Sequence, residues 1–158
     1  MEAVRRFADV FHPAHHVTAL VDFDNDCVTT SLACARALGE RLWGVRLDTS
    51  ETLVDRSLWG TMGSFRPVGV VPELVHAVRG ALDAEGFQRV RIVASGGFDA
   101  DRVRRFEAAG VPVDAYGVGS SLLRGNSDFT ADIVQVDGRP CAKVGRALRP
   151  NPRLERVS

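Results

Sequence analysis

The sequence predicts an α/β fold in which parallel strands alternate with helices. Short apolar runs recur along the chain, and each is followed by polar or glycine residues of the kind that end a buried strand. Segments with helical apolar spacing separate these runs. With 158 residues, of which 45% are hydrophobic, the chain is long enough to bury a core.

The first half of the chain supplies two strand and helix pairs. Strands are expected over 17–23 and 42–47, and helices over 1–11 and 28–38. Pro13 stops the first helix, and Gly39 ends the second. Segment 49–71 contains several glycines and is expected to be an extended loop with a helical turn near 53–59. Loops of this length are often functional.

The same alternation continues in the second half. Strands are expected over 90–94 and 113–116, and helices over 72–85 and 99–109. Pro72 suits the first turn of a helix, and Asp99 can cap the next one. Gly86 and Gly110 then close these two helices.

The spacing of the apolar residues changes after residue 125. Segments 129–136 and 139–144 alternate around Asp137-Gly138, a strong signal for a two-residue hairpin turn. The remaining tail is rich in proline and arginine. We therefore expect three parts: 1–125 with the site, a β-hairpin extension over 126–148, and a tail over 149–158.

Strands that alternate with helices imply a parallel sheet with right-handed crossovers. Two architectures fit this order: a small doubly wound sheet, or part of a (β/α) barrel. In both, functional residues gather at the carboxyl ends of the strands.

Charge and cysteine content exclude several classes of protein. The 20 basic and 20 acidic residues balance, which gives no electrostatic reason to expect a nucleic acid or an anionic membrane as partner. No apolar run approaches the length of a membrane span, and the N-terminus lacks a signal peptide pattern. The three cysteines form no C-x-x-C pair, so we expect no disulfide scaffold and a cytoplasmic location.

The expected strand ends carry residues suited to a phosphorylated ligand. They are Asp22; Arg46 and Asp48; Ser95, Gly96 and Gly97; and Gly117, Gly119 and Ser120. Glycine lets backbone amides approach an anion closely, and hydroxyls add donors. Carboxylates can hold Mg²⁺ or sugar hydroxyls, and an arginine can clamp a carboxylate or phosphate.

Each of these features also has a purely structural interpretation. A single glycine-rich turn is more often only a turn, and we interpret Asp26 as a helix cap. Arg46 either pairs with a carboxylate such as Asp48 or faces a site, because an unpaired buried arginine is unfavourable. The histidines around Pro13 are assigned to a loop or an interface, since they lack metal-ligand spacing.

Four segments in order resemble nicotinate phosphoribosyltransferases. GVRLDTS resembles the family's GVRxDSG segment, and RIVASGGFD resembles its third strand with a phosphate turn. DAYGVGSSL resembles the GVGT phosphate loop, and IVQVDGRPCAKVGR resembles the VxVDGxPxxK strands that follow. The resemblance covers about residues 17–149, with family-like spacing.

The resemblance implies a partial type II phosphoribosyltransferase α/β barrel followed by a β-hairpin. It implies formation of nicotinate mononucleotide from nicotinate and phosphoribosyl pyrophosphate in NAD salvage, with Mg²⁺ and with ATP as co-substrate. Arg46 would contact the nicotinate carboxylate and, with Asp48, would be catalytic. Asp22 and Asp48 would lie near ribose and Mg²⁺. The remaining strand-end residues (Ser95, Gly96, Gly97, Gly117, Gly119 and Ser120) would hold the 5-phosphate.

The chain also departs from the family pattern. The family has a phosphorylatable histidine in a G-T-x-x-H motif upstream of the first strand here, whereas Gly60-Thr61-Met62 follows the second strand and lacks the histidine of the motif. A full (β/α)₈ barrel takes roughly 250 residues. We therefore expect a half barrel, with a homodimer or a complementary N-terminal half as partner, and the activity of the isolated chain is left open.

Three alternatives remain open. A quinolinate-type phosphoribosyltransferase would need more basic residues to hold a second carboxylate, and Lys143 is the only lysine. A non-catalytic phosphate-binding or assembly remnant would bind phosphoribosyl pyrophosphate without turnover. A small flavodoxin-like domain would be a stable monomer that ignores this ligand.

Overall fold

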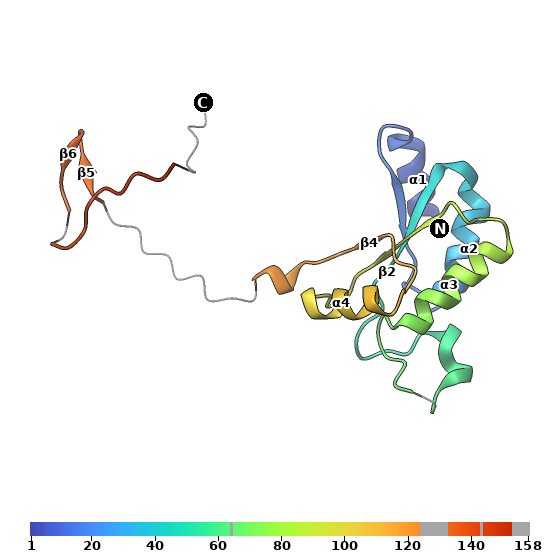
Figure 1. Cartoon of the computed structure of the whole chain (residues 1–158). Coiled ribbons are helices and arrows are strands. Elements are labelled where there is room, and N and C mark those ends of the chain that lie inside the picture. Colours follow the sequence, from blue (N-terminus) through green and yellow to red (C-terminus); the bar gives the residue numbers. More distant parts are fainter. Residues whose placement is uncertain (64, 124–132, 143, 153–158) are drawn as a thin grey trace. The chain divides into compact units, whose positions relative to one another are not determined.

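The computed structural model describes residues 1–63, 65–123, 133–142 and 144–152 (Figure 1). The chain divides into two compact units, Met1–Arg124 and Gly125–Ser158. No helix within the described residues combines the length and apolar character needed to cross a membrane.

The first unit is built on a four-stranded parallel sheet. Its strands are β1 (Val17–Leu20), β2 (Leu42–Leu47), β3 (Arg91–Ala94) and β4 (Ala115–Tyr116), in the order β1-β2-β3-β4. The predicted α/β class with parallel strands is therefore confirmed. The first strand ends earlier than expected because the chain turns at once, with the Asn25 amide donating to the Asp22 carbonyl.

The helices also match the predicted order. They are α1 (Glu2–Phe11), α2 (Cys27–Leu38), α3 (Pro72–Ala84) and α4 (Ala100–Ala108), with short 3-10 segments η1 (Gly39–Arg41), η2 (Arg56–Thr61) and η3 (Ser120–Leu123). Asp26 accepts from the Thr29 amide and Asp99 from the Arg102 amide, so both act as N-caps. Pro72 occupies the first turn of α3.

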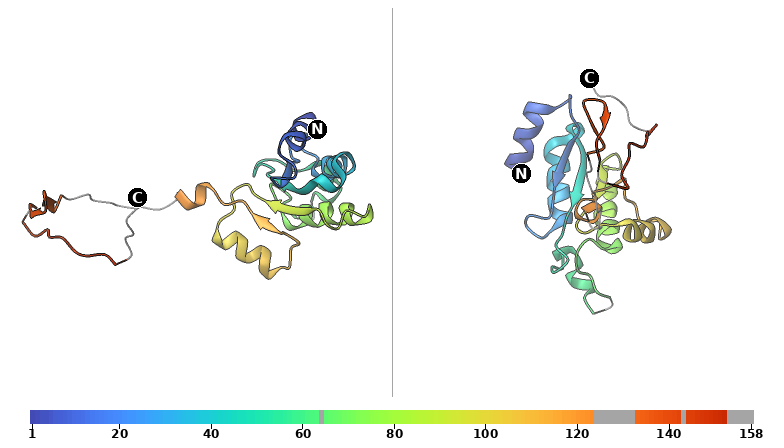
Figure 2. Two further views of the ribbon diagram at one scale, coloured as in Figure 1. Left: turned by 90° about the horizontal axis from the view of Figure 1, so that it is seen from above. Right: turned by 90° about the vertical axis from the view of Figure 1, so that its left-hand side faces the viewer.

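The strand order distinguishes the two predicted architectures. Successive right-handed crossovers in one direction place α2, α3 and α4 on one face of the sheet, whereas a doubly wound sheet needs a reversal of strand order. Figure 1 shows α2 beside α3, and Figure 2 shows the same layer from two further directions. The sheet is singly wound, as the sheet of a (β/α) barrel is.

The two faces of the sheet differ in burial. The covered face carries fully buried side chains, among them Val45, Leu47 and Ile92. The other face, which we call the open face, carries Leu20 at 55% exposure next to the exposed Arg46. Parallel sheets are usually covered on both faces, so this is an uncommon arrangement.

The second unit contains the predicted hairpin. Strand β5 (Gln135–Val136) pairs antiparallel with β6 (Arg139–Pro140). The turn residues Asp137 and Gly138 have φ values of 48° and 74°, as a type I′ turn requires. Both described strands are shorter than expected, and the expected strand residues 129–132 and 143 lie outside the described residues.

The long loop after β2 is tied to the start of α2. The carboxylate of Asp55 is fully buried and accepts from the Cys27 amide at 3.0 Å, the Ser57 amide at 2.9 Å and the Ser57 hydroxyl at 2.7 Å. The Asn25 side chain donates to the Val54 carbonyl at 2.8 Å. These bonds place the loop beside the turn that follows β1.

Replacing Asp55 with alanine should lower the free energy of unfolding by about 3 kcal/mol, because buried amide donors lose their acceptor. Asp26→Ala is the matched control, since it removes an exposed capping hydrogen bond at the same helix end and should cost about 1 kcal/mol. Urea denaturation of both variants measures the difference. Equal losses of stability would contradict a larger contribution from the buried hydrogen bonds of Asp55.

Candidate functional site

A pocket of about 400 Å³ opens at the carboxyl ends of β2, β3 and β4. Its lining consists of Arg46, Asp48, Val93, Ser95, Gly96, Gly97, Phe98, Gly117, Val118, Gly119 and Ser120. Every predicted site residue except Asp22 therefore lines this one pocket. The topology explains the gathering, because parallel strands bring their carboxyl ends to the same edge of the sheet.

Arg46 is held at two of its three guanidinium nitrogens. Nε donates to Ser95 Oγ at 2.8 Å, and Nη2 donates to Asp48 Oδ2 at 2.7 Å. Its third nitrogen, Nη1, has no partner among the described residues. The sequence left open whether Arg46 pairs with a carboxylate or faces a site; in the structure it pairs with Asp48 and also lines the pocket. With 47% of its side chain exposed, the ion pair contributes less than about 1 kcal/mol to stability.

The glycines of the two turns serve different purposes. Gly96 and Gly97 have φ values of 85° and 70°, which L side chains rarely adopt. Gly117 is instead needed for close approach, because a Cβ atom there would lie 2.8 Å from the Ser95 Cβ. At Gly119 no heavy atom lies within 4 Å of the corresponding position.

Two of the predicted phosphate donors already have acceptors. The Gly117 amide donates to the Ala94 carbonyl at 2.8 Å, and the Ser95 hydroxyl donates to the Leu47 carbonyl at 3.0 Å. The predicted donors that remain for an anion are therefore those of Gly96, Gly97, Gly119 and Ser120.

Asp22 lies in the turn after β1, outside the lining of the pocket. Partial burial raises the pKa of Asp22 above its usual value; the neighbouring Asp48 carboxylate adds to the rise and Arg46 opposes it. Its Oδ1 atom is buried and has no hydrogen-bond partner among the described residues. A carboxylate oxygen in this state can accept a cation or a sugar hydroxyl.

Arg102 was not singled out from the sequence, yet it holds the Ser95-Gly96-Gly97 turn. It donates to the Gly96 carbonyl at 2.8 Å and to the Val70 carbonyl at 2.7 Å. Its guanidinium carbon lies 4.4 Å from the Phe98 ring centroid. Its position in the first turn of the helix after the glycine turn was the available signal.

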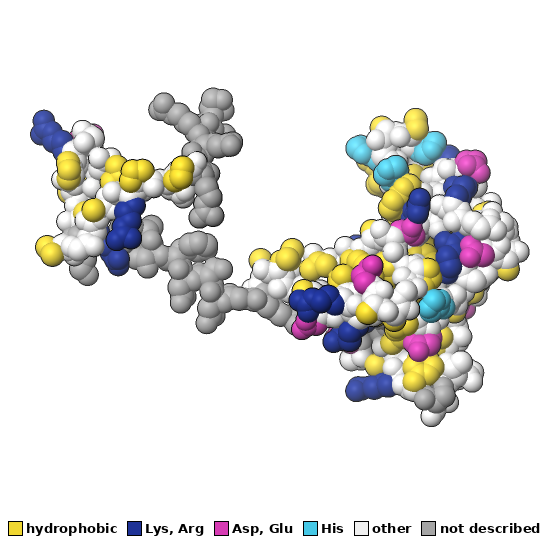
Figure 3. Space-filling model, in the orientation of Figure 1, with side chains coloured by type: hydrophobic (Ala, Val, Ile, Leu, Met, Phe, Trp, Pro, Cys, Tyr) yellow, Lys and Arg dark blue, Asp and Glu magenta, His cyan; other side chains and the backbone are white. Residues whose placement is uncertain are grey.

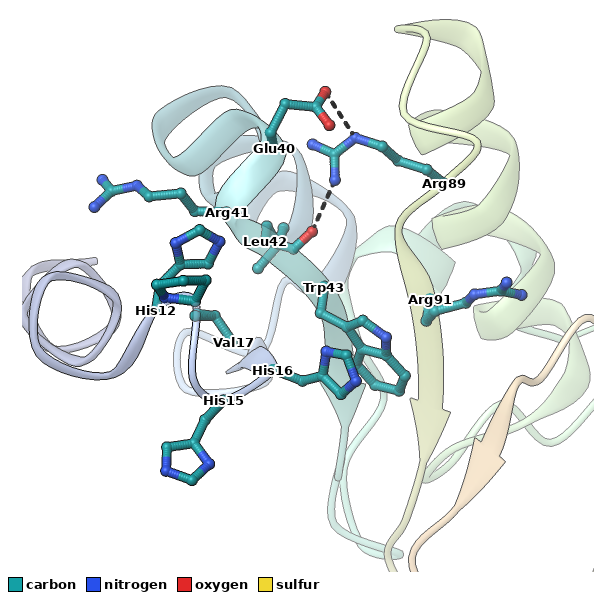
Figure 4. Close-up of a pocket in the computed structure, with 11 residues that line it drawn as sticks. His12, His15, His16, Val17, Glu40, Arg41, Leu42, Trp43, Arg89 and Arg91 are labelled. Carbon is teal, nitrogen blue, oxygen red and sulfur yellow. Dashed lines mark hydrogen bonds and ion pairs between the residues drawn. The ribbon is translucent and has the colours of Figure 1, made fainter.

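A second pocket, of about 330 Å³, lies at the amino ends of the strands (Figure 4). The His16 ring stacks on Trp43 with centroids 5.0 Å apart. Figure 3 shows histidine side chains gathered at this end of the first unit. No group of three or more His, Cys, Asp or Glu side chains among the described residues is arranged to hold a metal ion.

The arginines of this second pocket are already paired. Arg41 pairs with Asp9, Arg89 with Glu40, and Arg91 with Asp114. Arg89 also donates to the Leu42 carbonyl at 3.0 Å. The pocket therefore offers a ligand little unpaired charge, and the carboxyl-end pocket is the candidate site.

An arginine, a carboxylate and two glycine-rich turns at the carboxyl edge of a parallel sheet are typical of α/β proteins that bind phosphorylated ligands. Comparison with known proteins narrows this class. The nicotinate phosphoribosyltransferase pncB1 of Mycobacterium tuberculosis is 37% identical over 131 aligned residues, which cover 80% of this chain and 24% of the relative. The nicotinate phosphoribosyltransferase pncB2 of the same organism is 36% identical over 88 residues, covering 52% of this chain and 19% of the relative.

One solved structure is also similar to this chain. The crystal structure of nicotinate-nucleotide pyrophosphorylase from Pyrococcus furiosus matches with a TM-score of 0.62 and 33% identity, covering 92% of this chain and 33% of that chain. No family model matches the sequence. The resemblance predicted from the motifs is confirmed: this chain is related to nicotinate phosphoribosyltransferases. It spans 24% of the length of pncB1.

Gly117→Ala should lower the free energy of unfolding by about 1–3 kcal/mol, because the new Cβ overpacks against Ser95. Gly119→Ala should stay within about 0.5 kcal/mol of the wild type, since the space there is open. Chemical denaturation of the two variants tests the difference. A Gly117→Ala variant as stable as Gly119→Ala would contradict the close approach.

Proposed function

We propose that this chain carries the nicotinate and phosphoribosyl part of a nicotinate phosphoribosyltransferase site. The reaction forms nicotinate mononucleotide from nicotinate and phosphoribosyl pyrophosphate, in NAD salvage in the cytoplasm. The observation that carries the proposal is Arg46, half-exposed and held at two nitrogens, facing two glycine-rich turns across one pocket. The kinship to nicotinate phosphoribosyltransferases supports this assignment.

In this reaction the protein mainly has to position the two reactants. The pyridine nitrogen displaces pyrophosphate at the anomeric carbon, through a transition state with oxocarbenium character. Arg46 pairs with the nicotinate carboxylate and fixes the direction of the ring. Backbone amides at Gly96, Gly97 and Gly119, with the Ser120 hydroxyl, hold the 5-phosphate and so fix the ribose.

The pocket favours a substrate with one carboxylate. Among the described residues that line it, Arg46 is the only cationic side chain. A quinolinate-type enzyme must neutralise a second carboxylate, for which this wall of the pocket offers no second cation. Nicotinate is therefore the better fit.

Mg²⁺, the expected cofactor, fits the donor set at this edge of the sheet. Mg²⁺ is usually bound through one or two carboxylates together with substrate phosphates. Asp22 supplies an unpartnered buried oxygen, and Asp48 keeps Oδ1 beside the Gly96 turn. When bound, the ion would neutralise pyrophosphate as it leaves. Coupling to ATP stays an expectation from the resemblance.

Purified chain supplied with nicotinate, phosphoribosyl pyrophosphate and Mg²⁺, with and without ATP, should form nicotinate mononucleotide above an Arg46→Ala control. In calorimetric titrations, Arg46→Ala should weaken nicotinate binding at least about tenfold, the value of one charge-assisted hydrogen bond, and leave phosphoribosyl pyrophosphate binding within about twofold. Arg91→Ala is the matched control, since Arg91 lies on the same face at the other end of the sheet.

Equal losses for both ligands in Arg46→Ala would contradict the assigned role. Binding of phosphoribosyl pyrophosphate without product would instead favour the non-catalytic remnant, or a site that needs a second chain.

We further propose that another chain covers the open face, either a second copy or a complementary N-terminal half, so that the sheet becomes part of a barrel. Two features support this. Leu20, at the end of the edge strand β1, is half-exposed, and β1 pairs only with β2 among the described strands. An unpaired edge beside an apolar face promotes association.

Sedimentation velocity should show self-association of the chain. Leu20→Asp should shift it toward the monomer, because the charge would be buried in the interface. Thr52→Asp, a change in the exposed loop after β2, is the control and should leave association unchanged. A monomeric wild type with cooperative melting would contradict association with a second copy.

A further inference from the structure

Ser95 is a buried polar residue of the site. It follows β3 directly, and only 2% of the residue is exposed. Its amide continues the sheet by donating to the Leu47 carbonyl at 2.9 Å. Side chains alternate along a strand, so Ser95 lies on the same face as Val93, and Val93 is the register partner of Arg46. This register brings the serine hydroxyl to the guanidinium.

The hydrogen bonds of the Ser95 hydroxyl have only one possible direction. A hydroxyl has one proton and two lone pairs. The Leu47 carbonyl can only accept, so the Ser95 proton points to it, at 3.0 Å between oxygens. Arg46 Nε can only donate, so a Ser95 lone pair receives its proton, at 2.8 Å. The hydroxyl has no proton left for a phosphate.

From this count we propose that Ser95 is a positioning residue for Arg46 and does not donate to the ligand phosphate. Ser95 holds Nε and Asp48 holds Nη2, so the plane of the guanidinium is fixed. Nη1 then remains for the nicotinate carboxylate. A planar cation held in advance loses less conformational freedom when it binds a carboxylate. The inference rests on the proposed function where it names nicotinate.

Gly117 keeps the serine in place. The backbone at Gly117 passes so close that a Cβ there would lie 2.8 Å from Ser95 Cβ. The backbone that follows β4 therefore packs directly against the serine, and Gly117 supports Arg46 through Ser95.

Ser95→Ala isolates the hydroxyl without exposing a buried carbonyl, because the Leu47 carbonyl keeps its bond from the backbone amide of residue 95. Ser121→Ala is the matched control, since the Ser121 hydroxyl donates to the Phe98 carbonyl at 2.8 Å and does not touch Arg46. Both variants should fold. Their nitrogen-15 spectra can be recorded without any ligand.

The first readout is exchange of the Arg46 Hε proton with water. Loss of the Nε bond in Ser95→Ala should speed this exchange about tenfold, the effect of one hydrogen bond, while Ser121→Ala leaves it unchanged. An unchanged Arg46 Hε in Ser95→Ala would overturn the inference, whatever the chain binds.

The second readout is a titration with nicotinate and, separately, with ribose 5-phosphate. Ser95→Ala should weaken nicotinate binding about tenfold and leave ribose 5-phosphate binding within about twofold. Added to Arg46→Ala, it should cause no further loss, because the serine acts through the arginine. A loss of ribose 5-phosphate affinity that persists in the Arg46→Ala background would identify Ser95 as a phosphate donor. If the wild type binds neither ligand, the proposed function fails, and the exchange measurement still decides the positioning role.

Discussion

The pairing of β2 with β3 is the constraint on which the site depends. Their parallel register sets Arg46 opposite Val93, and the next side chain on that face of β3's extension is Ser95. A shift of one residue would turn Arg46 toward the helices and Leu47 toward the pocket. The buried apolar residues of the covered face prevent that shift. The hydrophobic core therefore determines which way the arginine points.

The loop after β2 is organised by the same edge of the sheet. Asp55 ties it to the start of α2, and Arg102 ties its far end, at Val70, to the Gly96 turn. Both anchors use buried or half-buried hydrogen bonds to backbone atoms, which are more costly to lose than surface ion pairs. A long loop is thus made part of the framework behind the pocket.

Much of the fold follows from local sequence patterns. Asp26, Pro72 and Asp99 mark helix starts through chemistry that acts within one turn, and the structure confirms all three. Asp137-Gly138 likewise marks its hairpin. Strand lengths were less predictable, because the residues that pair across the sheet are distant in sequence.

The grouping of candidate site residues was also predictable, since strand ends in a parallel sheet meet. Their individual contacts were not. Whether the Ser95 proton is free depends on the Leu47 carbonyl across the sheet, and the role of Arg102 depends on Val70 in a loop. Such contacts join residues far apart in the chain, and no local spacing encodes them.

Covering of the open face by another chain, as proposed above, would also affect the pocket. Leu20 and Arg46 are register partners on adjacent strands, so a chain that covers the apolar side chain also reaches the arginine. Binding of such a chain and binding of a ligand in the pocket would then be thermodynamically linked, and each would change the affinity of the other by the same factor. A covering chain with an acidic side chain near Arg46 would compete with a carboxylate substrate. A covering chain with a neutral side chain there would exclude water and strengthen the attraction between Arg46 and a bound carboxylate.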